Sequence, residues 1–365
     1  MDDRLVLFGL HEMEGIGWDT IKHIVNRPQG MQTLFGASRQ DLERFSVRTD
    51  RADFIVRQLT PSWIESRMEQ YDRKGIGFVT IWDEEYPPLL RETPAPPWVL
   101  YYRGDIGLSR RQPLIAMVGT RVPTAYGKNV ALSFASDLAK AGVVVVSGMA
   151  RGIDTRCHEG ALSAQGKTIA VLGSGIDVVY PRENRSLYEQ ICRDGLVLSE
   201  YPMQTQARPG LFPRRNRIIA GLTLGTVVVE ADEDSGSLIT AGYAVNMNRD
   251  VFAIPGPIRS PKSQGTLNLL KKGEAKLTTV MEDILEEYES WFGLLRHTYN
   301  IKSSASQQRT PEEDEIYRLI AEKPVTFNEL LAKSKCEFGH LHSVLLSLTI
   351  KKQIEQLPGS TYIII

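Results

Sequence analysis

A series of short apolar runs between residues 114 and 253 constrains the fold more than any other feature of the sequence. The runs cover 114–118, 143–147, 168–172, 196–199, 226–230 and 251–253, with helical spacing of apolar residues between them. Runs without polar alternation indicate strands buried on both faces, and helical connections indicate right-handed crossovers. The sequence therefore predicts an α/β fold with a doubly wound, mostly parallel sheet.

The segments before this sheet differ in character. Apolar spacing is helical from about residue 5 to residue 60, so residues 1–80 are predicted to form a small all-α domain. The glycines of Gly15-Ile16-Gly17 either contact DNA phosphate, as in a helix-hairpin-helix element, or simply turn the chain between helices. A proline-rich connector then leads to a short strand near residues 99–102, and the sheet domain is expected to span 81–290.

The end of the chain suggests a third domain. Residues 291–310 include the polar stretch 303–308 and are interpreted as a linker. Beyond it, helices are predicted near 328–333 and 338–351, followed by two strands around the turn at 358–360. Residues 311–365 therefore resemble a winged helix.

Composition restricts where and how such a chain acts. Three widely separated cysteines, Cys157, Cys192 and Cys336, lack pairing or zinc-type spacing, which favours a reducing compartment. The apolar runs are too short to span a bilayer, so we expect a cytoplasmic protein without membrane insertion. The formal net charge of −1 means that any nucleic-acid surface must be a local cluster of basic residues.

The connections after the strands are the candidate binding loops, because ligands of an open parallel sheet bind beyond the carboxyl ends of its strands. The first three contribute glycines that let a backbone approach an anion, together with basic side chains. These candidates are Gly119, Thr120 and Arg121 after the first strand, Ser147, Gly148 and Arg151 after the second, and Gly173 after the third. Lys167, just before the third strand, is a further candidate. Asp154 is interpreted as a helix N-cap rather than a catalytic acid.

The stretch 208–217 is the most informative. It gathers arginines, including Arg214 and Arg215, with Asn216 around the single aromatic residue Phe212. Guanidinium groups on phosphates and a ring on a base are the usual means of holding single-stranded nucleic acid. The alternative is a solvated loop in which Phe212 anchors to the core, and Arg217 is assigned to a structural ion pair.

The fifth connection resembles a phosphate loop that ends at a helix N-terminus, with Ser235, Gly236 and Ser237 facing an anion. The neighbouring acidic run 230–234 is interpreted as a solvated flank, because no histidine or second carboxylate cluster completes a metal site. The sequence contains no nucleotide-binding P-loop, no nucleophile elbow and no zinc-protease helix. We therefore predict no catalytic residue, metal or cofactor.

Read in order, these pieces resemble the DprA (Smf) family of natural transformation. The resemblance covers roughly residues 86–285 and rests on 119–121, 147–154, 171–177 with 180–184, 199–202, 212–220, 235–241 and 251–256. It implies an extended Rossmann fold that dimerises through this domain, binds and shields single-stranded DNA, loads the RecA recombinase on it, and is not an enzyme. It also implies that Arg121 and Lys167 contact phosphate and that the arginines from Arg214 extend the pocket.

Two other functions remain open. Rossmann proteins with anion-binding loops include nucleotide hydrolases that cleave the N-glycosidic bond, and Glu230 or Asp154 is the carboxylate placed for such chemistry. The terminal domain is also a candidate reader of duplex DNA through a helix carrying His340, His342 and Ser343, although a protein contact is an equal alternative.

Overall fold

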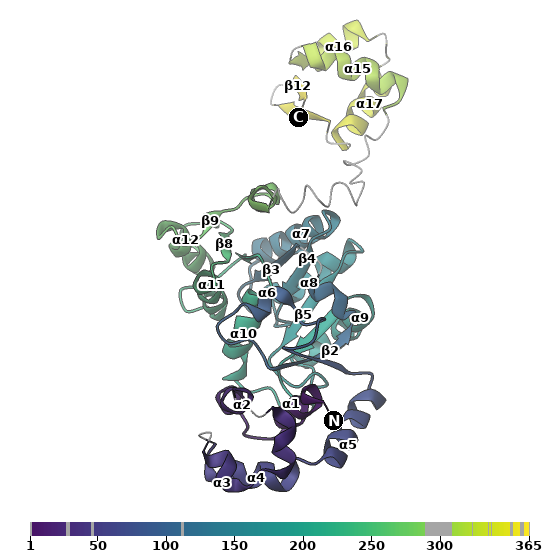
Figure 1. The fold of residues 1–365 in the computed structure, drawn as a ribbon. Coiled ribbons are helices and arrows are strands. Elements are labelled where there is room, and N and C mark those ends of the chain that lie inside the picture. The colour runs from purple at the N-terminus through teal and green to yellow at the C-terminus, as the bar shows by residue number, and fades with distance from the viewer. Residues whose placement is uncertain are drawn as a thin grey trace. The chain divides into compact units, whose positions relative to one another are not determined.

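The computed structural model in Figure 1 describes residues 2–26, 30–44, 47–110, 113–288, 309–322, 324–334, 336, 338–350, 353–357 and 361–364. The chain divides into two compact units, Met1–Leu295 and Arg296–Ile365. Most of the predicted linker lies outside the described residues, so the division of the chain into four segments stays a prediction.

The first unit begins with the predicted helical segment. Its elements are α1 (Asp3–Glu12), α2 (Trp18–Val25), η1 (Met31–Gly36), α3 (Arg39–Glu43), α4 (Thr49–Gln58) and α5 (Pro61–Arg73). Side-chain caps define several starts: Asp2 caps α1, Ser38 forms a capping box with Asp41, and Thr60 caps α5. The apolar face of α1 packs into a core that also includes Tyr101 and Val197 of the sheet. The helices and the sheet therefore share one hydrophobic core.

A nine-stranded sheet forms the centre of this unit, and the predicted doubly wound, mostly parallel arrangement is confirmed. Its order is β1-β2-β6-β5-β4-β3-β7-β8-β9, and the strands from β3 to β9 are parallel while β1 and β2 are antiparallel at one edge. The bounds are β1 (Gly77–Thr80), β2 (Val99–Gly104), β3 (Leu114–Val118), β4 (Val144–Ser147), β5 (Thr168–Leu172), β6 (Leu196–Ser199), β7 (Gly225–Val228), β8 (Asp250–Ala253) and β9 (Lys276–Leu277).

Helices cover both faces of this sheet (Figure 1). Alternate residues of β3 show the division, because Ile115 and Met117 pack against α7 and α8 while Ala116 and Val118 pack against α10 and α11. The remaining elements are α6 (Pro88–Arg91), η2 (Ile106–Ser109), α7 (Ala125–Lys140), α8 (Ile153–Ser163), η3 (Arg182–Asn184), α9 (Arg185–Asp194), α10 (Leu211–Gly221), α11 (Gly236–Asn246), η4 (Pro261–Ser263), α12 (Gln264–Lys271), α13 (Glu282–Leu285) and η5 (Glu286–Tyr288).

The strand order reverses at β3. From β3 the chain moves through β4, β5 and β6 in one direction, and it then returns to place β7 on the other side of β3. The loops that leave β3 and β7 therefore diverge toward opposite faces, which opens a crevice at the carboxyl ends of these two strands.

The second unit has the predicted mixture of helices and strands. It contains α15 (Pro311–Glu322), β10 (Val325–Thr326), α16 (Phe327–Lys333), α17 (Phe338–Ile350), β11 (Ile354–Leu357) and β12 (Thr361–Ile364). The strands form an antiparallel sheet of order β10-β12-β11, and Ile316, Leu330 and Leu341 belong to its core. The predicted turn at 358–360 lies outside the described residues.

Two histidines proposed for duplex reading contact their own unit. His342 of α17 lies 4.8 Å from the Phe327 ring centroid, and His340 lies 3.3 Å from a carboxylate oxygen of Glu312. Across the described part of the whole chain, no helix has both the length and the apolar character needed to cross a membrane.

Candidate functional site

A cavity of 580 Å³ occupies the crevice at the carboxyl ends of β3 and β7. We call it the site cavity. Its lining includes nine of the predicted residues, namely Gly119, Thr120, Arg121, Phe212, Arg215, Asn216, Ser235, Gly236 and Ser237. A small adjoining hollow of 50 Å³ is lined by Gly148, Arg151 and Gly173, and it shares Arg121 and Phe212 with the site cavity. The fold therefore brings five separate connections together at one edge of the sheet, those after β3, β4, β5, β6 and β7.

An exposed arginine and two aromatic rings stand at the centre of this site. The Arg121 guanidinium lies 5.3 Å from the Phe212 ring centroid, and the Tyr180 ring centroid lies 5.4 Å from that of Phe212. Gly173 permits this arrangement, because a Cβ atom there would lie 2.7 Å from Cδ1 of Phe212. The Phe212 ring rests on the Gly173 backbone and is half-buried, so it is neither a solvated loop residue nor a fully buried anchor.

Arg215 lies beneath the site rather than on its surface. It is 3% exposed, and its Nη1 donates to the carbonyl oxygens of Gly148 and Val171. Burial lowers the pKa of Arg215 to about 10, opposed by the charge of Asp154, so the guanidinium stays positive at neutral pH. Burial raises the pKa of Asp154, and the charge of Arg215 opposes this rise.

The N-cap prediction for Asp154 is wrong. Gly152 is the N-cap of α8, and Asp154 lies inside the first turn, where its carboxylate accepts from the Ala150 amide at 3.3 Å. It therefore braces the loop after β4 from within the helix.

The N-terminus of α11 forms the other wall of the site cavity. Ser235 is the N-cap and accepts from the Ser237 amide, and the two hydroxyl oxygens lie 2.8 Å apart. Free amides and the positive end of a helix favour an anion at this position. Lys262 from η4 reaches the same cavity and pairs with Asp232 at 2.8 Å.

Glu230 binds the N-cap residue of α7 at the same edge of the sheet. Its side chain is buried, and its two oxygens accept from the Thr124 amide at 2.9 Å and from the Thr124 hydroxyl at 2.6 Å. Thr124 is the N-cap of α7, so Glu230 fixes the start of that helix. A carboxylate held in this way is not directed at a ligand, and nothing in the geometry favours the hydrolase alternative.

Three predicted site residues lie elsewhere. The prediction that Lys167 joins the pocket is wrong: it precedes β5, and its amine donates to the Asp194 carbonyl at 2.8 Å. The five residues of β5 separate it from the site edge by about 16 Å. Ser147 is fully buried, and its hydroxyl donates to the Met117 carbonyl at 2.6 Å.

Arg214 does not line the site cavity, whereas its neighbour Arg215 does, because neighbouring residues on a helix face different directions. It is exposed, and its charge opposes the rise that burial causes in the pKa of the half-buried Glu200. The ion pair predicted for Arg217 is confirmed, with Glu200 as its partner.

The sequence reasoning also left out residues that the fold brings to this edge. Tyr180 lines both cavities, and the exposed Arg182 follows it by two residues in η3. The sequence feature that could have indicated Tyr180 and Arg182 is the Tyr-Pro pair followed by a basic residue in the loop after β5. Lys262 had no signal, because it reaches the site only through the packing of η4 against the loop after β7.

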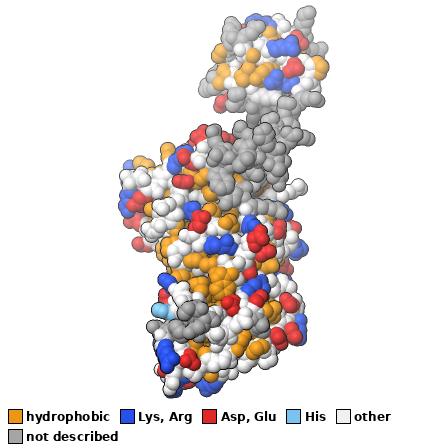
Figure 2. Space-filling model, in the orientation of Figure 1, with side chains coloured by type: hydrophobic (Ala, Val, Ile, Leu, Met, Phe, Trp, Pro, Cys, Tyr) orange, Lys and Arg blue, Asp and Glu red, His pale blue; other side chains and the backbone are white. Residues whose placement is uncertain are grey.

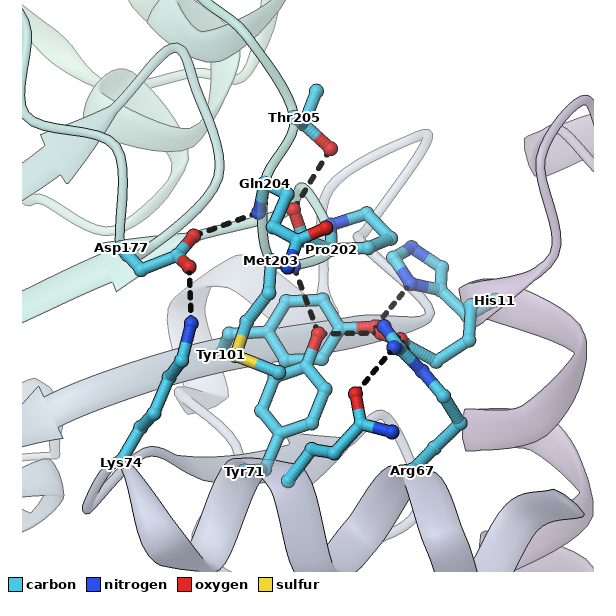
Figure 3. Close-up of polar contacts among 12 residues, drawn as sticks. His11, Arg67, Tyr71, Lys74, Tyr101, Asp177, Pro202, Met203, Gln204 and Thr205 are labelled. Carbon is cyan, nitrogen blue, oxygen red and sulfur yellow. Dashed lines mark hydrogen bonds and ion pairs between the residues drawn. The ribbon is translucent and has the colours of Figure 1, made fainter.

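A polar network joins the helical segment to the loop after β5 and the loop after β6 (Figure 3). The Tyr71 hydroxyl donates to Glu12 at 2.6 Å and accepts from the Met203 amide at 2.9 Å. Lys74 pairs with Asp177 at 2.9 Å, and the other Asp177 oxygen accepts from the Gln204 amide at 2.7 Å. Although burial opposes it, the Gln204 amide and the Lys74 ammonium lower the pKa of Asp177. Helix α5 therefore holds both the loop after β5 and the loop after β6.

The surface around these elements carries charges of both signs. Figure 2 shows basic and acidic side chains interspersed on the face that it presents, together with a broad apolar patch. This distribution agrees with the net charge of −1. No group of histidine, cysteine, aspartate and glutamate in the described ranges is arranged to hold a metal.

Comparison with known proteins places this geometry in a family. Residues 77–289 match the family model of DNA recombination-mediator protein A, and residues 301–360 match the DprA winged helix domain. Protein Smf of Synechocystis sp. is 37% identical over 81% of this chain and 82% of its own.

Two solved structures extend this comparison. The X-ray structure of DNA processing protein A from Streptococcus pneumoniae has 35% identity and a TM-score of 0.69, covering 79% of this chain and 99% of that one. A structure of DNA processing protein A from Helicobacter pylori, described as giving insight into its single-stranded DNA binding mode, has 31% identity and a TM-score of 0.53, covering 61% and 97%. This chain therefore belongs to the DprA/Smf family.

Proposed function

We propose that this protein binds single-stranded DNA in the site cavity and acts as a recombination mediator. The observation that carries the proposal is the stacking of the Arg121 guanidinium on the Phe212 ring, beside the N-terminus of α11. The single-stranded DNA binding mode described for the Helicobacter pylori relative supports the choice of ligand.

Each part of the site suits one part of a polynucleotide. The N-terminus of α11 at Gly236 and the guanidinium of Arg121 suit a phosphate, whereas the rings of Phe212 and Tyr180 suit an unstacked base. Arg215 lies on the floor of the site cavity together with the buried carboxylate of Asp154, so the exposed Arg121 supplies the accessible positive charge there. Duplex DNA keeps its bases stacked inside the helix, so the rings favour a single strand.

The proposed mediator role has three further parts. The protein shields incoming DNA during natural transformation, loads RecA on it, and works in the cytoplasm. It is not an enzyme: the two candidate carboxylates, Glu230 and Asp154, are held by backbone and side-chain groups of the protein itself. DNA recovered intact after incubation with the protein and magnesium is the expected outcome, and shortened products would contradict it.

We also propose that the protein forms a homodimer through the Rossmann-like domain. Strand β9 is an edge strand, and exposed apolar side chains lie on and beside it, including Leu277, which is 54% exposed, and Val280. Apolar residues at an open sheet edge are typical of a protein interface. Light scattering should give twice the chain mass, and Leu277→Glu should shift this value toward one chain.

The binding site is tested by fluorescence anisotropy with labelled oligo-dT and duplex DNA of equal length. The wild type should bind the single strand more tightly, with a log–log salt slope of about −0.7 for each phosphate contact. Arg121→Ala should weaken binding by about tenfold or more, since it removes a phosphate contact and loosens the stacked ring.

The matched control is Arg193→Ala, which removes an exposed arginine from the far end of α9. Equal affinities of the wild type and Arg121→Ala would refute the site assignment. The RecA role is read separately, as RecA-dependent ATP hydrolysis on DNA coated with single-strand binding protein. The wild type should accelerate it, and Arg121→Ala should not.

A further inference from the structure

A third cavity shares Arg121 with the site cavity and the small hollow. It has a volume of 320 Å³ and lies among the beginnings of α7 and α8, η3 and the loop after β3. We call it the outer basic cavity. Its charged lining consists of Arg121, Lys128, Arg151, Arg156, Glu159 and Glu183. Four positive and two negative groups leave an excess of two positive charges at neutral pH.

The basic side chains of this cavity stand on fixed elements. Lys128 is in the first turns of α7, and Arg156 is in the first turns of α8, so the positive ends of both helix dipoles add to the field there. The two helices also pack closely against each other, with Gly160 of α8 against the Leu132 carbonyl of α7. The spacing of the two cations is therefore set by the fold.

The loops on either side are held just as firmly. Gly152 has a φ of +82°, and a Cβ there would lie 2.5 Å from the Thr120 carbonyl oxygen. The next residue, Ile153, donates its amide to that same oxygen at 3.2 Å. This contact joins the loop that carries Arg121 to the loop that carries Arg151.

The existing partners of these cations are replaceable. Arg156 pairs with Glu159 at 2.7 Å and Arg151 pairs with Glu183 at 2.7 Å, but all four side chains are more than a third exposed. Exposed ion pairs contribute little to stability because water screens them. Lys128 has no ion-pair partner among the described residues. An incoming phosphate can therefore take the place of the carboxylates.

Arg121 lines the site cavity, the small hollow and the outer basic cavity alike, so the three form a continuous track. We propose that a bound single strand continues across Arg121 into the outer basic cavity, where Lys128 and Arg156 bind the phosphates of adjoining nucleotides. Among the described residues that line this cavity there is no aromatic side chain, which indicates that the cavity holds the phosphodiester backbone rather than bases. The inference rests on the proposed function and extends its binding path.

The test compares oligonucleotide lengths in the full-length protein. Wild type, Lys128→Ala/Arg156→Ala and the control Lys140→Ala/Arg193→Ala are titrated with oligo-dT of about 6 and about 16 nucleotides, two lengths within the range of about 4–16 nucleotides that single-strand sites cover. The control also removes two positive charges, but from the C-terminal ends of α7 and α9, whereas Lys128 and Arg156 lie near helix N-termini. Circular dichroism and thermal unfolding verify that each variant folds.

The double variant should bind the short oligonucleotide like wild type and lose most of the affinity gained with the long one. Its salt slope with the long oligonucleotide should be shallower by about 1.4, which corresponds to two phosphate contacts. Affinity equal to that of the control at both lengths would overturn the inference, as would equal losses at both. Displacement of the long strand by inorganic phosphate at the same phosphate concentration would also overturn it, because it would identify a site for small anions.

Failure of the proposed function has a different signature. In that case neither oligonucleotide binds the wild type, and Arg121→Ala changes nothing at either length.

Discussion

The hydroxyl of Tyr71 accepts a hydrogen bond from the backbone amide of Met203 at 2.9 Å, although 132 residues separate the two in the sequence. The same hydroxyl donates to the buried carboxylate of Glu12 at 2.6 Å. One phenol thus connects two helices of the N-terminal segment to the loop that leads into α10 and Phe212. This contact is the physical basis for treating the helices and the sheet as one unit.

Tyr71→Phe should destabilise the first unit by about 2 kcal/mol, because a buried amide and a buried carboxylate oxygen each lose a partner. Urea unfolding followed by tryptophan fluorescence measures this change. Tyr102→Phe is the matched control, since the Tyr102 hydroxyl has no hydrogen bond to another described residue. A similar loss in both variants would show that the network contributes nothing beyond packing.

Gly173→Ala should weaken binding of single-stranded DNA while leaving the fold intact. The added Cβ would lie 2.7 Å from Phe212, so the ring has to move and its stacking with Arg121 is lost. We expect an affinity loss of about 1–3 kcal/mol, the value of one stacked base, in anisotropy titrations with oligo-dT. Gly242→Ala makes the same chemical change in α11, where a Cβ meets open space, and should bind like wild type. Unchanged binding by Gly173→Ala would mean that the position of the ring is irrelevant.

Asp154 and Arg215 should show strong coupling in a double-mutant cycle. Arg215→Met removes the positive charge that faces a buried carboxylate, and such changes cost about 3–5 kcal/mol. Adding Asp154→Asn should recover part of this loss. The exposed pair Arg185 and Glu189, 3.1 Å apart, is the reference and should couple by about 0.5 kcal/mol at most. Additive effects at Asp154 and Arg215 would contradict a charge interaction.

Acid should destabilise the first unit before its carboxylates titrate. Burial lowers the pKa of His11 to about 4 and that of His158 to about 3, whereas unfolded histidine has a value of about 6.5. Below pH about 6.5 the unfolded chain binds protons that the folded chain does not. Stability that is complete above this pH should therefore fall by about 1.4 kcal/mol per pH unit for each histidine as the pH decreases toward 4.

Urea unfolding at several pH values measures this slope. His11→Gln should remove the contribution of one histidine, about 1.4 kcal/mol per pH unit, from this slope. His23→Gln, at an exposed position of α2, should leave the slope unchanged. A wild-type slope that is flat between about pH 6.5 and 5 would contradict neutral buried histidines.

The sequence by itself determined the strands from β2 to β8, the mostly parallel character of their sheet and the edge at which the candidate loops meet, but not the edge strands β1 and β9. Each of these depends on local patterns, namely unbroken apolar runs, helical spacing and glycines after strands, which act over a few residues. Ligands of a parallel sheet bind beyond the carboxyl ends of its strands, and Lys167 precedes its strand, so the same reasoning places it at the opposite edge. The resemblance to the family nevertheless implies that Lys167 lies in the pocket.

Only the tertiary structure decided which side chains enter the site. Arg214 and Arg215 are neighbours of the same type, yet the rotation of α10 directs one to the surface and buries the other beneath Gly148. Lys262 and Tyr180 likewise reach the cavity through contacts between distant segments. The direction of a side chain depends on how its helix or loop packs against elements far away in the chain, and no local pattern encodes that packing.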